Sequence, residues 1–333
     1  DTPGMDDEGK LGKLRVARTK NILGMTDIAI LVVDAASGLN GTDKELISLF
    51  KERSLPHIVV FNKSDLIGEI PPSEKNEIYA SSLSGYNINE LKEMTARLIK
   101  ERPQSPPLVS DLASAGDVIV LVIPIDKSAP KGRLILPQQQ VIRDALDNGI
   151  IPVMCRDTEL KNALLSLKNP PRLVITDSQA FKEVGAIVPE NIPLTSFSIL
   201  MARYKGNLEP SVNGAARLND IKEGDSILIS EGCTHHRQCE DIGAVKLPKM
   251  IKNFTGATPE ISLSSGTEFP EDLDKYKLII HCGACMLNPA EAKSRYERAA
   301  KAGVPITNYG MAIAYMNGIL ERSLSPLGIT LPR

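Results

Sequence analysis

Short apolar runs alternate with amphipathic segments along this chain, which is the pattern of buried strands separated by helices. The apolar runs predict strands at 28–33, 57–61, 118–125, 150–154, 172–176, 194–197, 226–230 and 277–281. The amphipathic segments predict helices at 89–100, 138–147, 158–167, 242–253, 289–301 and 310–322. Strands that are apolar throughout and are followed by helices favour parallel sheets covered on both faces. The pattern contains no evident internal repeat.

Two boundaries divide this series into three parts. The Pro-rich stretch from Pro103 to Pro107 is typical of an extended linker, and a second boundary lies near Lys205. A chain of 333 residues has the length of two or three domains. We therefore expect an α/β protein of three consecutive α/β domains with mainly parallel sheets, covering residues 1–104, 105–204 and 205–333.

The composition excludes several classes of protein. Hydrophobic residues make up 42% of the chain, and 39 Lys and Arg against 41 Asp and Glu give a net charge of −2. A globular protein without a basic field is not expected to bind nucleic acid or anionic membranes nonspecifically. The longest apolar run, Val118–Ile125, is far shorter than the about 20 residues that span a bilayer. With no signal-peptide pattern at its start, we expect a cytoplasmic protein.

Polar residues after the strand at 57–61 suit the recognition of guanine. Asn62-Lys63-Ser64-Asp65 directly follows this apolar run, so it lies at the carboxyl edge of the sheet, where open α/β sheets bind ligands. The Asp65 carboxylate can accept hydrogen bonds from the ring N–H and the amine of guanine, whereas adenine would leave it unpaired. Asn62 can pair with the other edge of the base, and the aliphatic stem of Lys63 can cover its face.

Two further sequences accompany this motif, Asp1-Thr2-Pro3-Gly4 before it and Ser81-Ser82-Leu83 after it. In this order and spacing the three sequences resemble the later half of a small GTPase domain. The resemblance implies that GTP binds here, with Mg²⁺ organised through water by Asp1 and the γ-phosphate contacted by the Gly4 N–H. It implies base recognition by Asn62 and Asp65 and by the Ser81-Ser82 backbone. The family usually has Ala in place of Ser82, and a backbone contact tolerates this change.

One part of a GTPase is absent from the pattern. No stretch of the chain fits Gly-x-x-x-x-Gly-Lys-Ser/Thr, the loop that cradles the α- and β-phosphates. We therefore expect that the N-terminal part of the G domain is missing, and that GTP hydrolysis by these residues alone is slow and impaired.

The middle domain lacks residues with evident chemistry. It has no histidine and no Gly-x-Gly-x-x-Gly loop, and Cys155 follows a predicted strand in the manner of a small buried hydrophobic residue. A small parallel sheet without a site of its own often serves assembly, so we expect this domain to form a homodimer.

Cysteine and histidine are concentrated in the last domain. Four of the five cysteines lie between Cys233 and Cys285, beside three of the four histidines, which is typical of reduced thiols that hold a metal. The groups 233–235 and 281–285 each follow a predicted strand, so both are expected at one sheet edge. A helix from Pro289, with Asn288 as its expected N-cap, would aim free N–H groups toward an anionic cluster.

Three kinds of site fit these residues. Zinc would take the three cysteines Cys233, Cys282 and Cys285 together with a fourth ligand such as Cys239 or His236. An iron–sulfur cubane would take the same cysteines with a non-cysteine fourth ligand. Cys282 and Cys285 alone would form a redox dithiol. The spacing does not separate zinc from a cluster.

The chain has Cys-x-His at 233–235 and, after 45 further residues, His-Cys-x-x-Cys at 281–285, together with the later half of a GTPase domain. This combination resembles the HydF family of FeFe-hydrogenase maturation GTPases. The resemblance covers the chain end to end and extends in the G domain to the bacterial tRNA-modification GTPases. It implies a 4Fe–4S cluster on Cys233, Cys282 and Cys285, with His235 and His281 as candidates for the fourth iron site.

The resemblance also implies a function. Members of the family are dimeric scaffolds that receive a two-iron precursor made by two radical-SAM maturases and deliver it to apo FeFe-hydrogenase. The alternative interpretation is a zinc-stabilised GTPase that acts in RNA modification or assembly.

Overall fold

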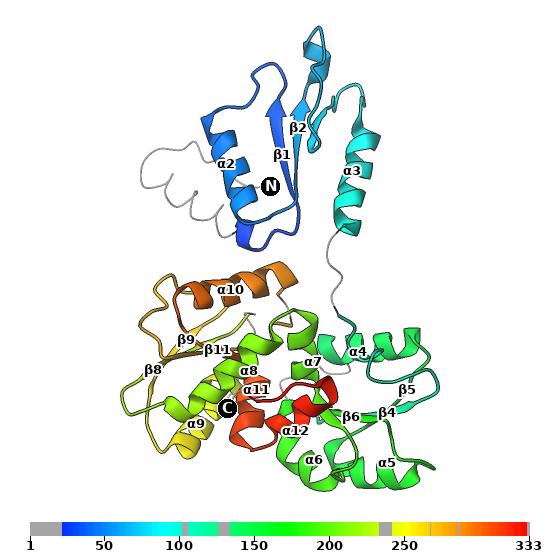
Figure 1. The fold of residues 1–333 in the computed structure, drawn as a ribbon, viewed down its shortest axis with the longest axis vertical. Helices are drawn as coiled ribbons and strands as arrows, with labels where there is room; N and C mark the ends of the chain where they lie inside the picture. Colours follow the sequence, from blue (N-terminus) through cyan, green and yellow to red (C-terminus); the bar gives the residue numbers. More distant parts are fainter. Residues whose placement is uncertain are drawn as a thin grey trace. The chain divides into compact units, whose positions relative to one another are not determined.

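The computed structural model describes residues 22–101, 106–125, 134–232 and 242–331, except residues 267 and 286. The chain forms two compact units, Asp1–Gln104 and Ser105–Arg333 (Figure 1). Every strand pair in the described residues is parallel. The predicted fold class, α/β with mainly parallel sheets, is therefore confirmed. Within the same residues, no helix combines the length and the apolar character needed to cross a membrane.

Unit 1 is a three-stranded parallel sheet with the order β1-β2-β3. The strands are β1 (Ala29–Asp34), β2 (His57–Asn62) and β3 (Glu77–Tyr79), accompanied by α2 (Gly41–Glu52), the short 3-10 helix η1 (Ser64–Leu66) and α3 (Ile88–Lys100). Successive side chains of a strand point to opposite faces of the sheet, so β2 contributes side chains to two hydrophobic cores. Ile58 and Val60 pack against α3, whereas Val59 and Phe61 pack on the opposite face. Both faces are covered, which explains why the four central residues of β2, Ile58 to Phe61, are all apolar.

Unit 2 contains two four-stranded parallel sheets, ordered β5-β4-β6-β7 and β9-β8-β10-β11. The strands are β4 (Val118–Val122), β5 (Ile151–Cys155), β6 (Leu173–Thr176), β7 (Leu194–Ser196), β8 (Ser226–Ser230), β9 (Glu260–Ser264), β10 (Leu278–His281) and β11 (Ile306–Asn308). The α-helices are α4 (Leu136–Asp147), α5 (Leu160–Ser166), α6 (Phe181–Ile187), α7 (Phe197–Tyr204), α8 (Leu208–Ala216), α9 (Leu247–Thr255), α10 (Pro289–Lys301), α11 (Tyr309–Met316) and α12 (Leu320–Leu324). Shorter turns are η2 (Asp157–Glu159), η3 (Ser178–Ala180), η4 (Arg217–Asp220), η6 (Ser325–Leu327) and a π-helical turn, η5 (Ile242–Lys246).

The two sheets of unit 2 have the same topology and form an internal repeat that the sequence analysis did not find. Asp117 and Asp225 precede the first strand of each half, and each carboxylate accepts the N–H of the residue three positions earlier, at 2.9 and 2.8 Å. Ser196 and Asn308 end the last strand of each half, and each side chain caps the helix that follows. These hydrogen bonds occur at equivalent positions of the two halves, which supports the conclusion that the two halves share one fold.

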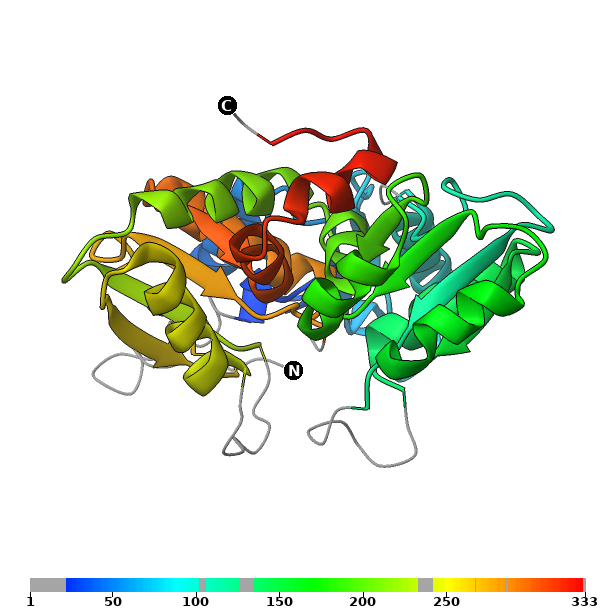
Figure 2. The same ribbon diagram turned by 90° about the horizontal axis from the view of Figure 1, so that it is seen from below.

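The two halves of unit 2, residues 105–216 with the first sheet and 217–331 with the second, exchange their last α-helices. Helix α8 packs against β11 of the second sheet, and α12 packs against β7 of the first, as Figure 2 shows. Gly214 in α8 permits this approach, because a Cβ there would lie 2.1 Å from the Ile306 carbonyl oxygen. One hydrophobic core contains Val120 of the first sheet and Ile280 of the second. The boundary predicted at 204/205 thus falls where both sheets share one core, whereas 104/105 separates the two units.

The helix predicted at 310–322 is two helices in the structure, α11 and α12. Gly318 lies between them with φ +68°, a left-handed conformation that glycine adopts readily and that ends helices. The sharp turn directs α12 onto the first sheet.

Candidate nucleotide and cysteine sites

Asn62 and Ser82 lie together at the carboxyl edge of the sheet in unit 1. The Ser82 N–H donates to Asn62 Oδ1 at 3.0 Å, and Asn62 Nδ2 donates to Ser82 Oγ at 3.3 Å. The loop after β2 is drawn toward the loop after β3 because the Ser64 N–H donates to the Ala80 carbonyl at 3.1 Å. The structure therefore joins two motifs that are 20 residues apart in the sequence.

Asp65 is held at the same edge by Ser81. The Ser81 hydroxyl is fully buried and donates to Asp65 Oδ1, and it accepts the Ser84 N–H at 3.2 Å. Asp65 itself is exposed, and its Oδ2 has no hydrogen-bond partner in the described part of the chain. A carboxylate fixed through one oxygen and open to solvent at the other is suited to accept hydrogen bonds from a ligand.

Asp34 also belongs to this edge, although it was not predicted as a site residue from the sequence. It is the last residue of β1 and lies in register with Asn62, and its Oδ2 is 2.8 Å from Lys63 Nζ. The hydrogen bond from Lys63 lowers the pKa of Asp34, and the same bond raises the pKa of Lys63. Lys63 is exposed and Asp34 is only half-buried, so this ion pair orients the Lys63 side chain more than it stabilises the fold. An aspartate directly after an apolar strand is the signal that could have revealed it.

The structure thus brings together five predicted nucleotide-site residues, Asn62, Lys63, Asp65, Ser81 and Ser82. Asp1 and Gly4, the other two, lie outside the described residues.

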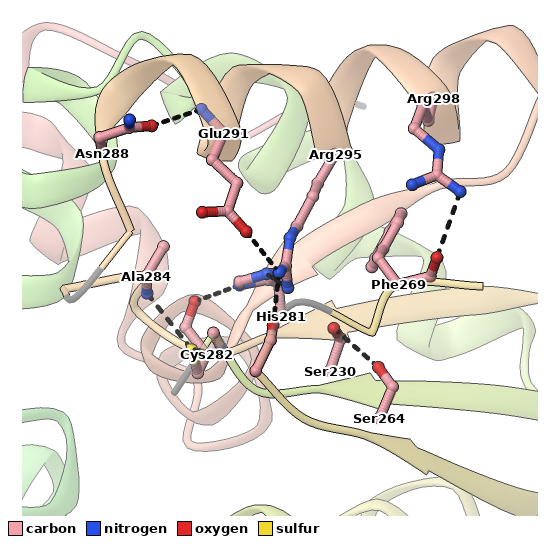
Figure 3. A network of polar contacts seen from close by, with 12 residues as sticks. Ser230, Ser264, Phe269, His281, Cys282, Ala284, Asn288, Glu291, Arg295 and Arg298 are labelled. Atoms are coloured by element: carbon pink, nitrogen blue, oxygen red, sulfur yellow. Dashed lines mark hydrogen bonds and ion pairs between the residues drawn. The ribbon is translucent and has the colours of Figure 1, made fainter. Parts of the chain in front are cut away.

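The cysteine loop, residues 282–288, connects β10 to α10 in unit 2 (Figure 3). Cys282 Sγ accepts the Gly232 N–H at 3.0 Å and the Ala284 N–H at 3.4 Å. Ala284 has φ +52°, a left-handed conformation that costs a residue with a Cβ about 1–2 kcal/mol. Cys282 and Cys285 are half-buried and form no disulfide with any cysteine in the described part of the chain. Two N–H groups directed at one sulfur favour its thiolate form.

His281, at the end of β10, is fully buried and uses both ring nitrogens. Arg295 Nη1 lies 3.0 Å from His281 Nε2, and the Cys282 carbonyl oxygen lies 2.8 Å from Nδ1. Burial and the neighbouring Arg295 lower the pKa of His281 to about 4, so the ring is neutral at pH 7. Nδ1–H therefore donates to the carbonyl and Nε2 accepts from the guanidinium. The ligand role of His281 stays a prediction, and it requires that one of these hydrogen bonds be given up.

Arg295 and Glu291 extend this network along α10, and neither was predicted from the sequence. Arg295 Nη2 is 2.8 Å from Glu291 Oε1 and donates to the Gly266 carbonyl at 2.6 Å. The spacing of Glu and Arg by four residues on a predicted helix was the available signal. At the start of this helix, Asn288 Oδ1 accepts the Glu291 N–H at 2.8 Å, which confirms the expected N-cap.

The donor set of the cysteine loop suits an anionic thiolate-bound group. Among the described residues, no three His, Cys, Asp or Glu side chains form a metal-binding group. Cys233 and His235 lie outside the described residues, as do His236 and Cys239. Gly232, the residue before Cys233, is nevertheless the one whose N–H reaches Cys282 Sγ. The last described residue before the 233–235 motif therefore contacts the first cysteine of the cysteine loop.

Comparisons with known proteins find relatives for both units of the chain. Residues 108–206 match the hydrogen maturase F dimerization domain, and residues 209–326 match the hydrogen maturase F tetramerization domain. GTPase Der of Kosmotoga olearia is 33% identical over 110 residues, covering 27% of this chain and 25% of that protein. The tRNA modification GTPase MnmE of Lactobacillus helveticus is 33% identical over 105 residues, covering 29% and 22%. GTPase Era of Caldicellulosiruptor saccharolyticus is 29% identical over 117 residues, covering 31% and 39%. The chain thus spans less than half the length of these relatives.

Proposed function

The chain belongs to the hydrogen maturase F family, a family of hydrogenase maturation GTPases, and on this premise we propose that it is a GTP-binding scaffold that carries a 4Fe–4S cluster. In this function it receives a two-iron precursor and delivers it to apo FeFe-hydrogenase, and slow GTP hydrolysis is its only catalysis. The two radical-SAM maturases that make the precursor and the apo-hydrogenase that accepts it are its partners in the cytoplasm.

The nucleotide part of this proposal rests on the edge of unit 1. Asp65, fixed by the buried Ser81 hydroxyl, recognises the two donors of guanine. Asn62, fixed by Ser82, pairs with the other edge of the base, and Lys63 covers its face. Asp1 and Gly4 take the Mg²⁺ and γ-phosphate roles that the GTPase resemblance implies.

The cluster part is carried by one observation, the two N–H groups that meet at Cys282 Sγ. Cys282 and Cys285 on one loop, with Cys233 directly after Gly232, would hold three irons. When bound, the cluster supplies an electron carrier with one iron position that no cysteine fills. His235 and His281 are the candidates for that position. The residues of the chain hold the loop in place, and Arg295 keeps the neutral His281 ring oriented beside it.

Self-association is the role of the first half of unit 2. Strand β5 is the edge of its sheet, and it exposes Ile151 to 50% and Met154 to 53%. A sheet edge with apolar side chains and unpaired backbone groups is a surface on which a second strand can pair. We propose that β5 forms the homodimer contact.

Replacing Met154 by lysine tests this contact. A charge on the apolar edge opposes strand pairing, so Met154→Lys is expected to raise the dimer dissociation constant at least tenfold, or about 1.4 kcal/mol, in analytical ultracentrifugation. Leu263→Lys is the matched control, because Leu263 occupies the equivalent place in the edge strand β9 of the second sheet and is 42% exposed. It should leave this dimer intact. A Met154→Lys protein that dimerises as tightly as the parent contradicts the assignment of β5.

Anaerobic reconstitution with iron and sulfide tests the proposed function as a whole. A brown protein whose broad visible absorption bleaches on reduction, and which then activates apo-hydrogenase, is the expected result. A colourless protein that retains zinc would instead support the alternative, a zinc-stabilised GTPase that acts in RNA modification or assembly. Iron counting and EPR on the same sample separate the two outcomes.

A further inference from the structure

The side chain of Lys205, in the first half of unit 2, contacts the cysteine loop of the second half. Lys205 follows α7, and its Nζ donates to the Ala284 carbonyl and, at 3.2 Å, to the Leu287 carbonyl. These two carbonyls flank Cys285. Among the described residues, no carboxylate pairs with Lys205. Burial lowers the pKa of Lys205, and the thiols of Cys285 and Cys282 oppose this shift. The charge of this side chain is therefore directed at the loop that carries the two cysteines.

The internal repeat shows that the end of α7 does not itself require a lysine. The equivalent residue at the end of α11 is Asn317, and the two have nearly the same backbone, φ −88° and ψ 0° at Lys205 and φ −89° and ψ 2° at Asn317. A glycine with positive φ follows each of them. The Asn317 side chain turns back and donates to the Ile313 carbonyl of its own helix at 2.9 Å. The lysine occurs in the half whose helix end faces the cysteines.

A cation in this place acts on the loop in two ways. Its two hydrogen bonds hold the carbonyls on either side of Cys285, including that of Ala284, whose left-handed backbone needs support from its surroundings. Its charge lies in a partly buried site, where electrostatic interactions are stronger than in water. A positive charge stabilises the more negative, reduced form of an iron–sulfur cluster and therefore raises its reduction potential.

We propose that Lys205 is a positioning residue for the cluster, one that fixes the cysteine loop and sets the reduction potential from the opposite half of the unit. This inference rests on the proposed function, because it needs a cluster on Cys233, Cys282 and Cys285.

The experiment compares three variants of the reconstituted full chain with the parent by redox titration followed by EPR. Lys205→Asn introduces the residue that the repeat carries at the equivalent helix end, so the cap is kept and the charge is lost. Its cluster is expected to be harder to reduce by about tenfold in the equilibrium constant, a shift of about −59 mV for one electron. It should also lose iron to a chelator several times faster. Lys205→Arg should keep a potential near that of the parent. Lys161→Asn, an exposed lysine on α5, is the control and should match the parent.

A Lys205→Asn protein with a full cluster and the potential of the parent overturns the inference. Lys205→Met, which keeps the aliphatic stem, gives the same test if asparagine unfolds the chain, as thermal melting would reveal. A parent protein that takes up no iron overturns the proposed function and this inference together. That failure is seen in the parent, whereas a failure of the Lys205 assignment alone is seen only in the variants.

Discussion

Replacing Cys282 or Cys285 by serine is expected to abolish assembly of the cluster. Both thiols lie on the loop between β10 and α10, and the Gly232 and Ala284 N–H groups are directed at Cys282 Sγ. A serine hydroxyl ionises far less readily than a thiol and is a poor iron ligand. Cluster occupancy should fall by roughly tenfold or more, since even substitutions outside the ligand shell reach that scale at metal sites.

Iron and sulfide content and EPR after anaerobic reconstitution measure this effect. Cys155→Ser is the matched control, because Cys155 is also half-buried but ends β5 in the first half of the unit. Its cluster should be that of the parent. Cys233→Ser should behave as the two loop variants do. A serine variant at any of the three positions that keeps its full complement of iron shows that the cysteine is not a ligand.

Replacing Asp65 by asparagine is expected to change the base that the protein prefers. The asparagine amide can donate to the second carbonyl of xanthine, where the carboxylate of Asp65 accepts from the amine of guanine. GTP should bind about a hundredfold more weakly, roughly 3 kcal/mol, which is the scale of a polar group left unpaired in a binding site. The affinity for xanthosine triphosphate should rise correspondingly. Both are measured by calorimetry on a version extended at its N-terminus to include a phosphate-binding loop.

Two further variants separate recognition of the base from orientation of the carboxylate. Ser81→Ala removes the buried hydroxyl that donates to Asp65, so it should weaken GTP without improving xanthosine triphosphate. Glu69→Gln, an exposed carboxylate nearby in the sequence, should change neither affinity. If Asp65→Asn binds GTP as the parent does, Asp65 does not contact the base.

The sequence was sufficient for the features that depend on neighbouring residues. The buried strand β2 was visible because both of its faces are covered, and the N-cap at Asn288 because Asn-Pro at a helix start is a local signal. The guanine motif could also be placed, since Asn62 directly follows the predicted strand at 57–61 and open α/β sheets bind ligands at the carboxyl edge. Ser81 and Ser82 were assigned only through the resemblance to small GTPases. Helix α2 was missed although its capping box, Asn40 with Asp43, is also local. The three-residue strands β3 and β11 were missed because three residues are too few to show a periodic pattern of apolar and polar positions.

The tertiary structure alone decided the features that join distant parts of the chain. Lys205 and Ala284 are separated by 79 residues, and neither the helix end nor the loop contains a local sign of the other. The sequence indicates His281 as a candidate metal ligand. Its hydrogen bond with Arg295 could not be predicted, because it forms only where β10 and α10 pack together. The exchange of α8 and α12 between the halves depends on the close approach of Gly214 to β11. Periodicity reports which face of an element is buried, whereas the partner that buries it is chosen by the packing of the whole unit.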